Sequence, residues 1–374
     1  MNALSLPFCL VWAALVAATS FGAVSIGYAG PIGGKGTTTQ IVAVDNDTGS
    51  ICVKGTLPSA STTYIAVNRA RTRLYTTHTD AAFGGKGADG GVAVYELDAA
   101  GMPGKLLDVV ATTRGAPCHL ALSGDEKWLV FAEYGKATAG WVALNADGVF
   151  DHKTLGVVAC TDPAGPNKPR QDRPHFHCAR VTPDGKYVCV ADLGTDRVKL
   201  YSLADGSFVR DLITTPAGAG PRHLLFHPNG KFAFLVFELG NLVSSYRYED
   251  GVFTPVMQLS LLPDDVTTES YASALKFSED GTELFCTNRG HESIAVFAVN
   301  ADNGYMRRRG VMKLDASFPA DLEIMPGGKI LAVGLTKDKL VRTYRYDKAT
   351  CTLTPVDAVK DIGAIFCSTF FSAN

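Results

Sequence analysis

The sequence lacks an excess of either charge, with 35 basic side chains against 37 acidic ones and only 19% of residues charged. Proteins that bind the phosphate backbone carry a clear excess of Lys and Arg, so we expect no nucleic-acid partner. At 46% hydrophobic residues, the chain is too apolar to be disordered. Its nine cysteines among 374 residues are too few for a disulfide scaffold.

Basic residues are absent from the first 34 positions, and the first one is Lys35. Residues 4–24 are nearly uncharged, which is typical of a cleavable secretory leader, although no Lys or Arg forms the usual positive n-region. We therefore expect a signal peptide over residues 1–23 and an exported protein, with a cytoplasmic protein as the alternative. No later segment is apolar for 18 residues, so the mature chain, residues 24–374, is expected to stay off the membrane.

The chain has no Cys-x-x-Cys pair, and an even number of cysteines would remain after removal of the leader. That number permits disulfides in an oxidising compartment, but Cys189 and Cys286 sit inside apolar runs, which favours buried free thiols. The remaining cysteines would be Cys52, Cys118, Cys160, Cys178, Cys189, Cys286, Cys351 and Cys367. One glycosylation sequon begins at Asn46, and the same residues are typical of an ordinary turn.

Glycine is abundant, with 38 residues, and much of it falls in a repeated pattern. The four clearest copies each read as an apolar strand, an Asp-Gly, Asn-Gly or Gly-Gly turn, and a second strand. Asp-Gly and Asn-Gly favour type I′ hairpin turns, in which both central residues need a positive φ. The copies lie at 181–194, 226–240, 277–290 and 324–335, with weaker ones at 67–79 and 122–134.

Six such copies, spaced 45 to 59 residues apart, are typical of a β-propeller with four short antiparallel strands per blade. The two ends of the chain lie outside the six copies. Residues 40–54 resemble outer strands without inner partners, and residues 364–371 resemble an inner strand without outer ones. We therefore predict an all-β fold, a single seven-bladed β-propeller closed by pairing of the N- and C-terminal strands, which removes exposed sheet edges.

The residue that ends the second strand of each copy varies in chemistry, although the turns and the apolar frame repeat. Hairpin geometry also places Arg222 beside Glu238 and His177 near Asp192. Converging charges at one mouth of the ring indicate a ligand pocket. The alternatives are solvated rim residues and a structural ion pair. The aligned positions are Thr79, Tyr134, Asp192, Glu238, Arg289 and Leu335.

Several motifs together resemble the propeller-type 6-phosphogluconolactonase family, which is itself similar to the fungal carboxymuconate cycloisomerases. The similarity covers roughly residues 24–370. The motifs are Gly220–Asn229, Phe237–Leu239, Pro174–His177, Ala191–Asp196 and Thr287–Gly290, and the loop Gly165–Gln171 matches part of the family. The resemblance implies a site without metal or other cofactor, with His177, Arg222, Glu238 and Arg289 as its catalytic residues.

The expected substrate is a small anionic lactone, and further residues are expected to bind it. These substrate-binding candidates are Tyr134, Arg170, His175, Asp192 and His223. The sequence departs from the family pattern at Ala274, Ala320 and Leu335, which suggests that one side of the pocket has lost polar groups.

Opening a sugar lactone requires a base that activates water, stabilisation of the oxyanion and a positive grip on the substrate's charge. Glu238 has the chemistry of a base or a water-orienting group, although flanking arginines would depress its pKa. His177 could donate to the carbonyl oxygen or shuttle a proton. The pair His175 and His177 could suggest a metal, but no third ligand has a recognisable spacing. The leading hypothesis is a lactonase, with a lactone-forming cycloisomerase or a non-catalytic binding propeller as alternatives.

Overall fold

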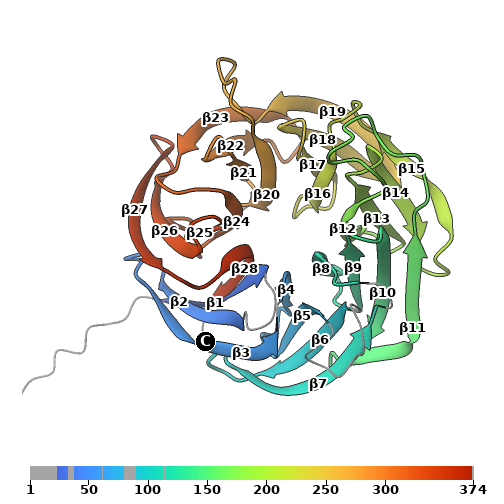
Figure 1. Ribbon diagram of the computed structural model, residues 1–374, viewed down its shortest axis with the longest axis horizontal. Coiled ribbons are helices and arrows are strands. Elements are labelled where there is room, and N and C mark those ends of the chain that lie inside the picture. The colour runs from blue at the N-terminus through green and yellow to red at the C-terminus, as the bar shows by residue number, and fades with distance from the viewer. Residues whose placement is uncertain (1–22, 33–37, 61, 80–89, 113–114, 373–374) are drawn as a thin grey trace, which may run out of the picture.

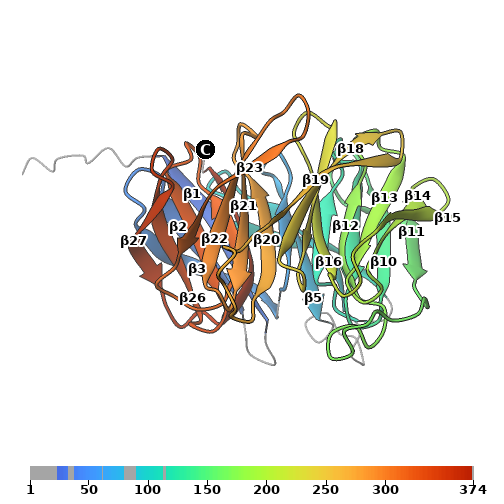
Figure 2. The same cartoon turned by 90° about the horizontal axis from the view of Figure 1, so that it is seen from above.

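The computed structural model describes residues 23–32, 38–60, 62–79, 90–112 and 115–372, which form 28 strands and no helix (Figure 1). The strands make seven four-stranded antiparallel sheets around a central axis, which confirms the predicted seven-bladed propeller. They run between the two faces of a thick disc (Figure 2). Apart from Ala23, the predicted leader lies outside the described residues. No helix long and apolar enough to cross a membrane is found in the part that the structure describes.

Each blade has four strands, which run in the following order from the central axis outward. The first blade contains β28 (Ala364–Ser372), β1 (Val24–Ile32), β2 (Thr38–Asp45) and β3 (Ile51–Ala60); the second contains β4 (Ile65–Val67), β5 (Arg73–Thr79), β6 (Gly90–Leu97) and β7 (Pro103–Ala111); the third contains β8 (His119–Leu122), β9 (Trp128–Glu133), β10 (Thr138–Leu144) and β11 (Phe150–Ala159); the fourth contains β12 (Phe176–Val181), β13 (Tyr187–Asp192), β14 (Arg197–Ser202) and β15 (Phe208–Thr214). The fifth contains β16 (Pro221–Phe226), β17 (Phe232–Phe237), β18 (Leu242–Glu249) and β19 (Val252–Ser260); the sixth contains β20 (Tyr271–Phe277), β21 (Glu283–Arg289), β22 (Ser293–Val299) and β23 (Met306–Lys313); the seventh contains β24 (Pro319–Ile324), β25 (Ile330–Leu335), β26 (Leu340–Asp347) and β27 (Thr352–Val359).

The first blade joins the two ends of the chain, as predicted. Its innermost strand, β28, pairs antiparallel with β1 in a register that sets Ile26 opposite Phe371 and Gly30 opposite Cys367. This pairing closes the ring, so neither terminal strand leaves an open edge toward its neighbour.

The hairpin turns differ from the predicted type I′ geometry. At the turn between β12 and β13, the Gly185 N–H donates to the Thr182 carbonyl, and only Gly185 has a positive φ, of 71°. Asp184 instead uses its carboxylate to accept bonds from the Thr182 hydroxyl and the Lys186 N–H. The loop is therefore a four-residue connection, a type I turn followed by a left-handed glycine. Asp is favoured here because its carboxylate accepts the turn's hydrogen bonds, and Gly because it tolerates the positive φ.

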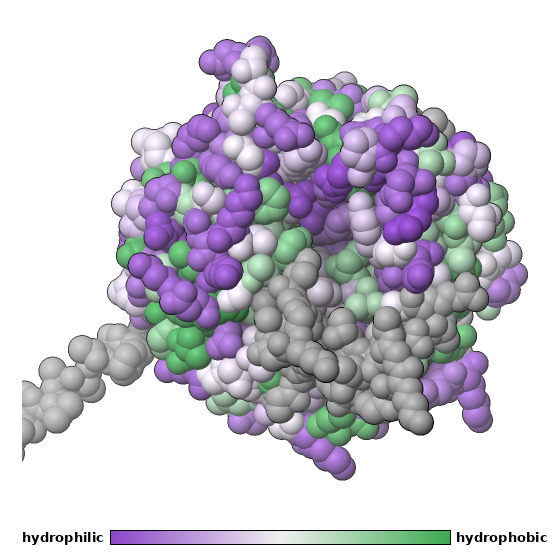
Figure 3. Space-filling view, viewed as in Figure 1, coloured by the Kyte–Doolittle hydropathy of each residue, from purple (hydrophilic) through white to green (hydrophobic). Residues whose placement is uncertain are grey.

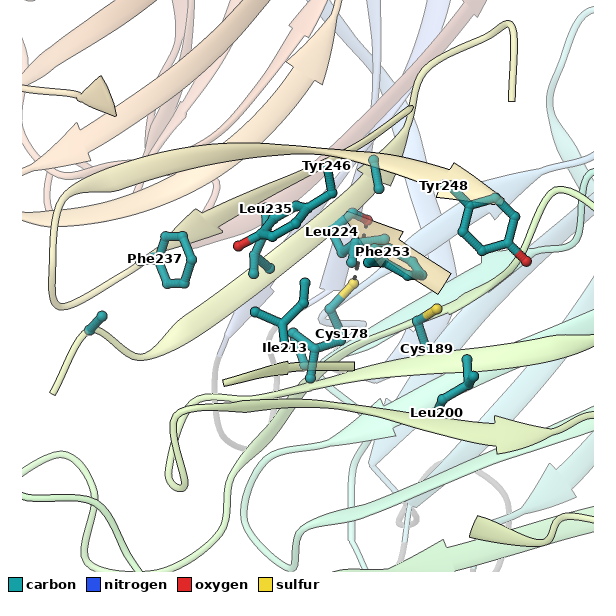
Figure 4. Packing of buried hydrophobic residues seen from close by; sticks show 14 residues of the cluster. Cys178, Cys189, Leu200, Ile213, Leu224, Leu235, Phe237, Tyr246, Tyr248 and Phe253 are labelled. Carbon is teal, nitrogen blue, oxygen red and sulfur yellow. Dashed lines mark hydrogen bonds between the residues drawn. The ribbon is translucent and has the colours of Figure 1, made fainter. Parts of the chain in front are cut away.

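The core lies between neighbouring blades. The middle strands are buried on both faces, as in β17, where all six residues are buried. Between the fourth and fifth blades, Cys178, Leu235 and Phe237 pack with Tyr246 (Figure 4). The eight described cysteines are free thiols, of which Cys178, Cys189, Cys286 and Cys367 are buried. Asn46 of the sequon is only 6% exposed in the turn after β2, which favours its interpretation as a turn residue.

A register shift recurs near one end of the innermost strands. In β12, Phe176 pairs with Asp192 and Cys178 with Ala191, so His177 is passed over. The same β-bulge passes over Arg222 in β16, Ala320 in β24 and Phe366 in β28. Bulges re-aim a side chain. These bulges occur next to the central cavity, which His177, Arg222 and Phe366 line.

Candidate active site

A cavity of about 430 Å³ lies on the axis at the end of the strands that carries the bulges. Figure 3 shows a hydrophilic hollow near the centre of the ring. The lining residues come from six of the seven blades and their connecting loops. They are Thr63, Tyr64, Cys118, Tyr134, Arg170, His177, Arg222, His223, Glu238, Arg289 and Phe366.

Glu238 stands at the centre of the charged side of this cavity, with its side chain 1% exposed. The Arg222 Nε donates to Glu238 Oε2 at 2.9 Å, as hairpin geometry predicted. The Arg289 Nη2 lies 3.1 Å from Oε1, and Arg170, from the loop between β11 and β12, also bonds Oε1. One carboxylate therefore gathers three guanidinium groups from three different parts of the chain.

The surroundings keep Glu238 ionised. Burial acts to raise its pKa, but the charges of Arg289 and Arg222, together with His177 and Arg170, outweigh burial and hold the pKa of Glu238 well below its usual range. A carboxylate with such a low pKa has little tendency to take a proton at neutral pH. Glu238 is thus suited to ordering the arginines and poorly suited to acting as a general base.

His177 has the opposite electrostatic character, because burial and the nearby Arg222 charge lower its pKa from 6.5 to about 3. Its Nε2 lies 3.8 Å from Glu238 Oε2, beyond hydrogen-bond distance. Its Nδ1 is buried and has no hydrogen-bond partner among the described residues. The cavity therefore holds a neutral imidazole beside an ionised carboxylate.

Other ring-bearing side chains pack against the His177 imidazole on both sides. Tyr134 meets His177 edge to face, with centroids 5.5 Å apart. On the other side, the centroid of the His223 ring lies 5.3 Å from that of the His177 ring and 6.2 Å from that of the Tyr64 ring. Tyr134 and His223 were both predicted to bind substrate, and both line the cavity together with the four predicted catalytic residues.

Two predicted substrate-binding residues lie behind the cavity wall. The His175 ring stacks on the Tyr134 ring, with centroids 4.1 Å apart. Its Nδ1 is hydrogen-bonded to the Tyr134 carbonyl at 3.0 Å, and its Nε2 to Asp172 Oδ1 at 2.8 Å. The fully buried Asp192 accepts bonds from the N–H groups of His175 and Gly194. Both residues support the wall, and neither is among the residues that line the cavity.

Asp192 was misplaced by one residue when the copies were aligned, because it is the seventh residue after Gly185 whereas Glu238 is the eighth after Gly230. Its pairing with Phe176 makes Asp192 equivalent to Phe237, which pairs with Pro221 in the next blade. The residue equivalent to Glu238 is therefore one position further along. By the same registers Tyr134 and Arg289 match Glu238 and line the cavity, whereas Asp192 and Leu335 stop one residue short.

The three apolar departures, Ala274, Ala320 and Leu335, are buried and lie outside the cavity lining. Ala274 and Leu335 are fully buried in the cluster between the sixth and seventh blades. Ala320 is 1% exposed, and its carbonyl accepts a bond from the Ser273 hydroxyl at 2.6 Å. None of the three is among the lining residues. Ala320 occupies the bulge position that His177 and Arg222 hold in their blades, so the loss of polar groups from this side of the pocket stays a prediction.

Sequence reasoning missed the wall opposite the arginines. Thr63, Tyr64, Cys118 and Phe366 form this wall, which carries no charge. Burial raises the pKa of Cys118 to about 12, so its thiol stays protonated. Phe366 occupies the same bulge position in its blade as Arg222 does, and this position indicates that it lines the cavity. The sequence shows this equivalence only to a reader who already knows that the bulge exists.

A larger hollow of about 680 Å³ lies at the other end of the strands, between the turns of the sixth and seventh blades. Several of its charges are paired within the protein, for example Lys348 with Glu283 at 3.5 Å. A similar groove separates the turns of the second and third blades. Because such grooves recur where hairpin ends meet, we regard them as consequences of blade packing.

Among the described residues, no group of three or more His, Cys, Asp or Glu side chains is arranged to hold a metal ion.

Comparison with known proteins gives matches of three kinds. The sequence model of the family described as "Lactonase, 7-bladed beta-propeller" matches residues 26–370. The 6-phosphogluconolactonase of Bacillus subtilis is 30% identical over 311 residues, or 82% of this chain and 86% of the relative. An uncharacterised protein of Staphylococcus saprophyticus is 32% identical over 84% of this chain and 89% of its own length. The structure of a periplasmic gluconolactonase of Pseudomonas aeruginosa superposes with a TM-score of 0.80 at 26% identity, covering 94% of this chain and all of that one.

Proposed function

The chain belongs to the seven-bladed β-propeller lactonase family, and we propose that it hydrolyses an anionic sugar lactone of the 6-phosphogluconolactone type. The observation that carries this proposal is the cluster around Glu238. Three guanidinium groups share one carboxylate inside the axial cavity, so the site keeps an excess of positive charge. Planar guanidinium groups bind both oxygens of a carboxylate or phosphate, which fits an anionic substrate.

In the proposed reaction, a water oxygen attacks the lactone carbonyl carbon while His177 accepts a water proton. The imidazolium that forms lies beside the ionised Glu238, 3.8 Å from Nε2, which stabilises its charge. Arg170, which also lines the cavity, stabilises the negative charge on the carbonyl oxygen, while Arg222 and Arg289 bind the anionic group of the substrate. The ring C–O bond then breaks, and His177 returns its proton to the departing alkoxide, leaving a hydroxyl group and a carboxylic acid, which releases the second water proton to solvent and becomes a carboxylate.

An anionic substrate would also improve His177 as a base. Arg222 and Arg289 help to lower the pKa of His177 in the empty cavity. A bound phosphate or carboxylate offsets part of their positive charge and moves the pKa of His177 back toward the neutral range, where general bases work best. Binding and proton abstraction are thereby coupled through the same arginines.

We propose export as the location of the mature chain, since the leader predicted over residues 1–23 agrees with the periplasmic gluconolactonase among its structural neighbours. In that location the substrate would include unphosphorylated lactones, whereas a cytoplasmic chain would meet the phosphorylated sugar. Intact-mass measurement of the protein from its native source tests export. A chain beginning between about residues 19 and 30 supports it, and one that retains residues 1–18 contradicts it.

The activity is tested by measuring proton release from purified protein with 6-phosphoglucono-δ-lactone, glucono-δ-lactone and a carboxylated muconolactone. We expect hydrolysis of an anionic sugar lactone well above its spontaneous rate. Conversion between the muconolactone and its open-chain diacid would favour the cycloisomerase alternative, since the same arginines could bind carboxylates. Spontaneous rates with all three compounds would contradict the proposal.

A further inference from the structure

Phe318, the residue before β24, has a backbone conformation unusual for its size. Its φ is +65°, in the left-handed region, and the next residue is Pro319. Bulky residues rarely adopt a positive φ, and a residue before proline favours the extended region. The matching position in the fifth blade, before Pro221, is Gly220, with a φ of 62°. A phenylalanine therefore occupies a site whose backbone suits glycine.

Several contacts hold Phe318 in this strained state. Its N–H donates to Glu292 Oε2 at 2.5 Å, and its carbonyl accepts from the Thr336 N–H at 3.1 Å. The ring lies under two cations, with Arg289 Cζ 5.4 Å and Lys337 Nζ 4.7 Å from its centroid. Backbone strain that the surroundings maintain in this way occurs preferentially at functional sites.

Arg289 is the cavity residue that the Phe318 ring contacts. Burial lowers the pKa of Arg289, although Glu238 opposes this effect, so its charge is poorly solvated. Its Nε donates to the Tyr271 carbonyl, and its Nη2 donates to the Ala272 carbonyl and lies within ion-pair distance of Glu238 Oε1. Nη1 has no hydrogen bond to any residue that the structure describes, so it is available to a ligand in the cavity.

We propose that Phe318 is a positioning residue for substrate binding, whose ring holds the Arg289 guanidinium with Nη1 available to the anionic group of the substrate. The attraction between the aromatic face and the cation stabilises the buried charge, as cation–π contacts do. The strained backbone places the ring where a glycine would leave Arg289 uncovered. The inference rests on the proposed function, because it assumes that Arg289 binds an anionic lactone.

The test compares Phe318→Leu, which loses the aromatic face, with Phe318→Tyr, which keeps it. For 6-phosphoglucono-δ-lactone, Phe318→Leu should raise KM roughly five- to tenfold with kcat little changed, the range expected for one cation–π contact. Phe318→Tyr should restore the wild-type KM. For the uncharged glucono-δ-lactone, neither variant should change KM.

Phe208→Leu is the matched control, because Phe208 also lies near a cation, 5.4 Å from Lys199 Nζ, on a strand outside the cavity. It should leave both KM values unchanged. Equal losses with charged and uncharged lactones in Phe318→Leu, accompanied by a lower melting temperature, would show a merely structural role and overturn the inference. If Phe318→Leu does not fold, Phe318→Gly, which accepts the positive φ, should show the same selective rise in KM.

Calorimetric binding of 6-phosphogluconate, the ring-opened product, separates this inference from the proposed function. If the wild-type protein hydrolyses no lactone but binds 6-phosphogluconate, and Phe318→Leu binds it more weakly, the proposed function fails and the inference stands. If the wild-type protein hydrolyses the anionic lactone and Phe318→Leu has an unchanged KM, the inference alone fails.

Discussion

At the scale of single residues, the role of Glu238 is set by what surrounds it. In the sequence it is one acidic residue near the end of a strand, with the chemistry of a base. In the fold it is buried among Arg170, Arg222 and Arg289, and their charges hold its pKa well below the usual range. Its contribution is to hold three like charges together in one cavity, which no other described carboxylate lines.

Glu238→Gln should therefore impair both activity and stability. It removes the only negative charge among three guanidinium groups, and removal of one partner of a buried ion pair costs about 3–5 kcal/mol. We expect kcat/KM to fall by roughly 10²-fold or more and the melting temperature to fall clearly. Asp250→Asn is the control, since Asp250 pairs with Lys186 on the surface at 2.7 Å and such pairs contribute little. Wild-type activity and stability in Glu238→Gln would refute the role given to this carboxylate.

His177 gives a prediction about pH. Its pKa in the free protein is about 3, so the imidazole stays unprotonated through the range in which an ordinary histidine titrates. If His177 is the base, kcat/KM should be flat from pH 7.5 down to about pH 5, and His177→Gln should lower kcat by roughly 10²- to 10⁴-fold. Initial rates across this range provide the measurement. A fall in kcat/KM with a midpoint near pH 6.5 would show that the catalytic base titrates in the usual histidine range, and would contradict a base whose pKa is held near 3.

At the scale of strands and turns, the repeated Asp-Gly, Asn-Gly and Gly-Gly turns were enough to predict the blades, because they mark every hairpin in the clear copies. They were also enough to place Arg222 beside Glu238. The bulges in β12, β16, β20, β24 and β28 were not predictable, since they leave no composition of their own: the passed-over residue is His177 in one blade, Ala320 in another and Phe366 in a third. The bulge accounts for the missed contribution of Phe366 to the uncharged wall. Asp192 was misplaced because the seventh residue after Gly185 was aligned with the eighth after Gly230.

Arg170 illustrates a second limit. It lies in the loop between β11 and β12 and reaches Glu238 across 68 residues of sequence. No local periodicity marks such a contact, and only the resemblance of its loop to part of the family pointed to it. Loop residues that converge on a site depend on tertiary packing, which a single sequence does not encode as a pattern.

The closure of the first blade can be tested by truncation. Ending the chain before Ala364 removes β28, which fills the innermost position of that blade and pairs with β1 along eight residues. The exposed edge of β1 and the lost core residues Ile365 and Cys367 should lower the melting temperature and cause aggregation. Size-exclusion chromatography and thermal melts check this outcome. A monomeric truncated protein with wild-type melting would show that the ring does not depend on terminal pairing.

At the scale of the whole molecule, three histidines that burial keeps neutral lie at or next to the axial cavity. Burial, with nearby cations, lowers the pKa of His177 to about 3 and holds those of His119 and His223 well below 6.5. The unfolded chain would bind protons at these residues near pH 6.5, whereas the folded protein would not. The stability that depends on them is therefore fully present above pH 6.5 and is lost as pH falls toward 3.

Thermal melts should reveal this loss between about pH 6.5 and 5, where most unfolded aspartate and glutamate side chains are still ionised. Each buried histidine contributes up to about 1.4 kcal/mol per pH unit within this window. His119→Gln should make the decline shallower, and His152→Gln, at a residue with 55% side-chain exposure, should not. A melting temperature that is constant from pH 7 to 5 would contradict neutral, buried histidines in the axial group.

The central claim is that the guanidinium cluster around Glu238 binds the charge of a lactone substrate, and Arg222→Lys tests it most directly. Lysine keeps the positive charge but loses the planar fork that bonds Glu238 and the Ser273 carbonyl. The measurement is the ratio of kcat/KM for 6-phosphoglucono-δ-lactone to that for glucono-δ-lactone, in the wild type and the variant. We predict that the wild type prefers the anionic lactone and that Arg222→Lys reduces this preference by roughly tenfold, mainly through KM. An unchanged ratio in a folded variant, or a wild-type protein with no preference for the anionic lactone, would contradict the account.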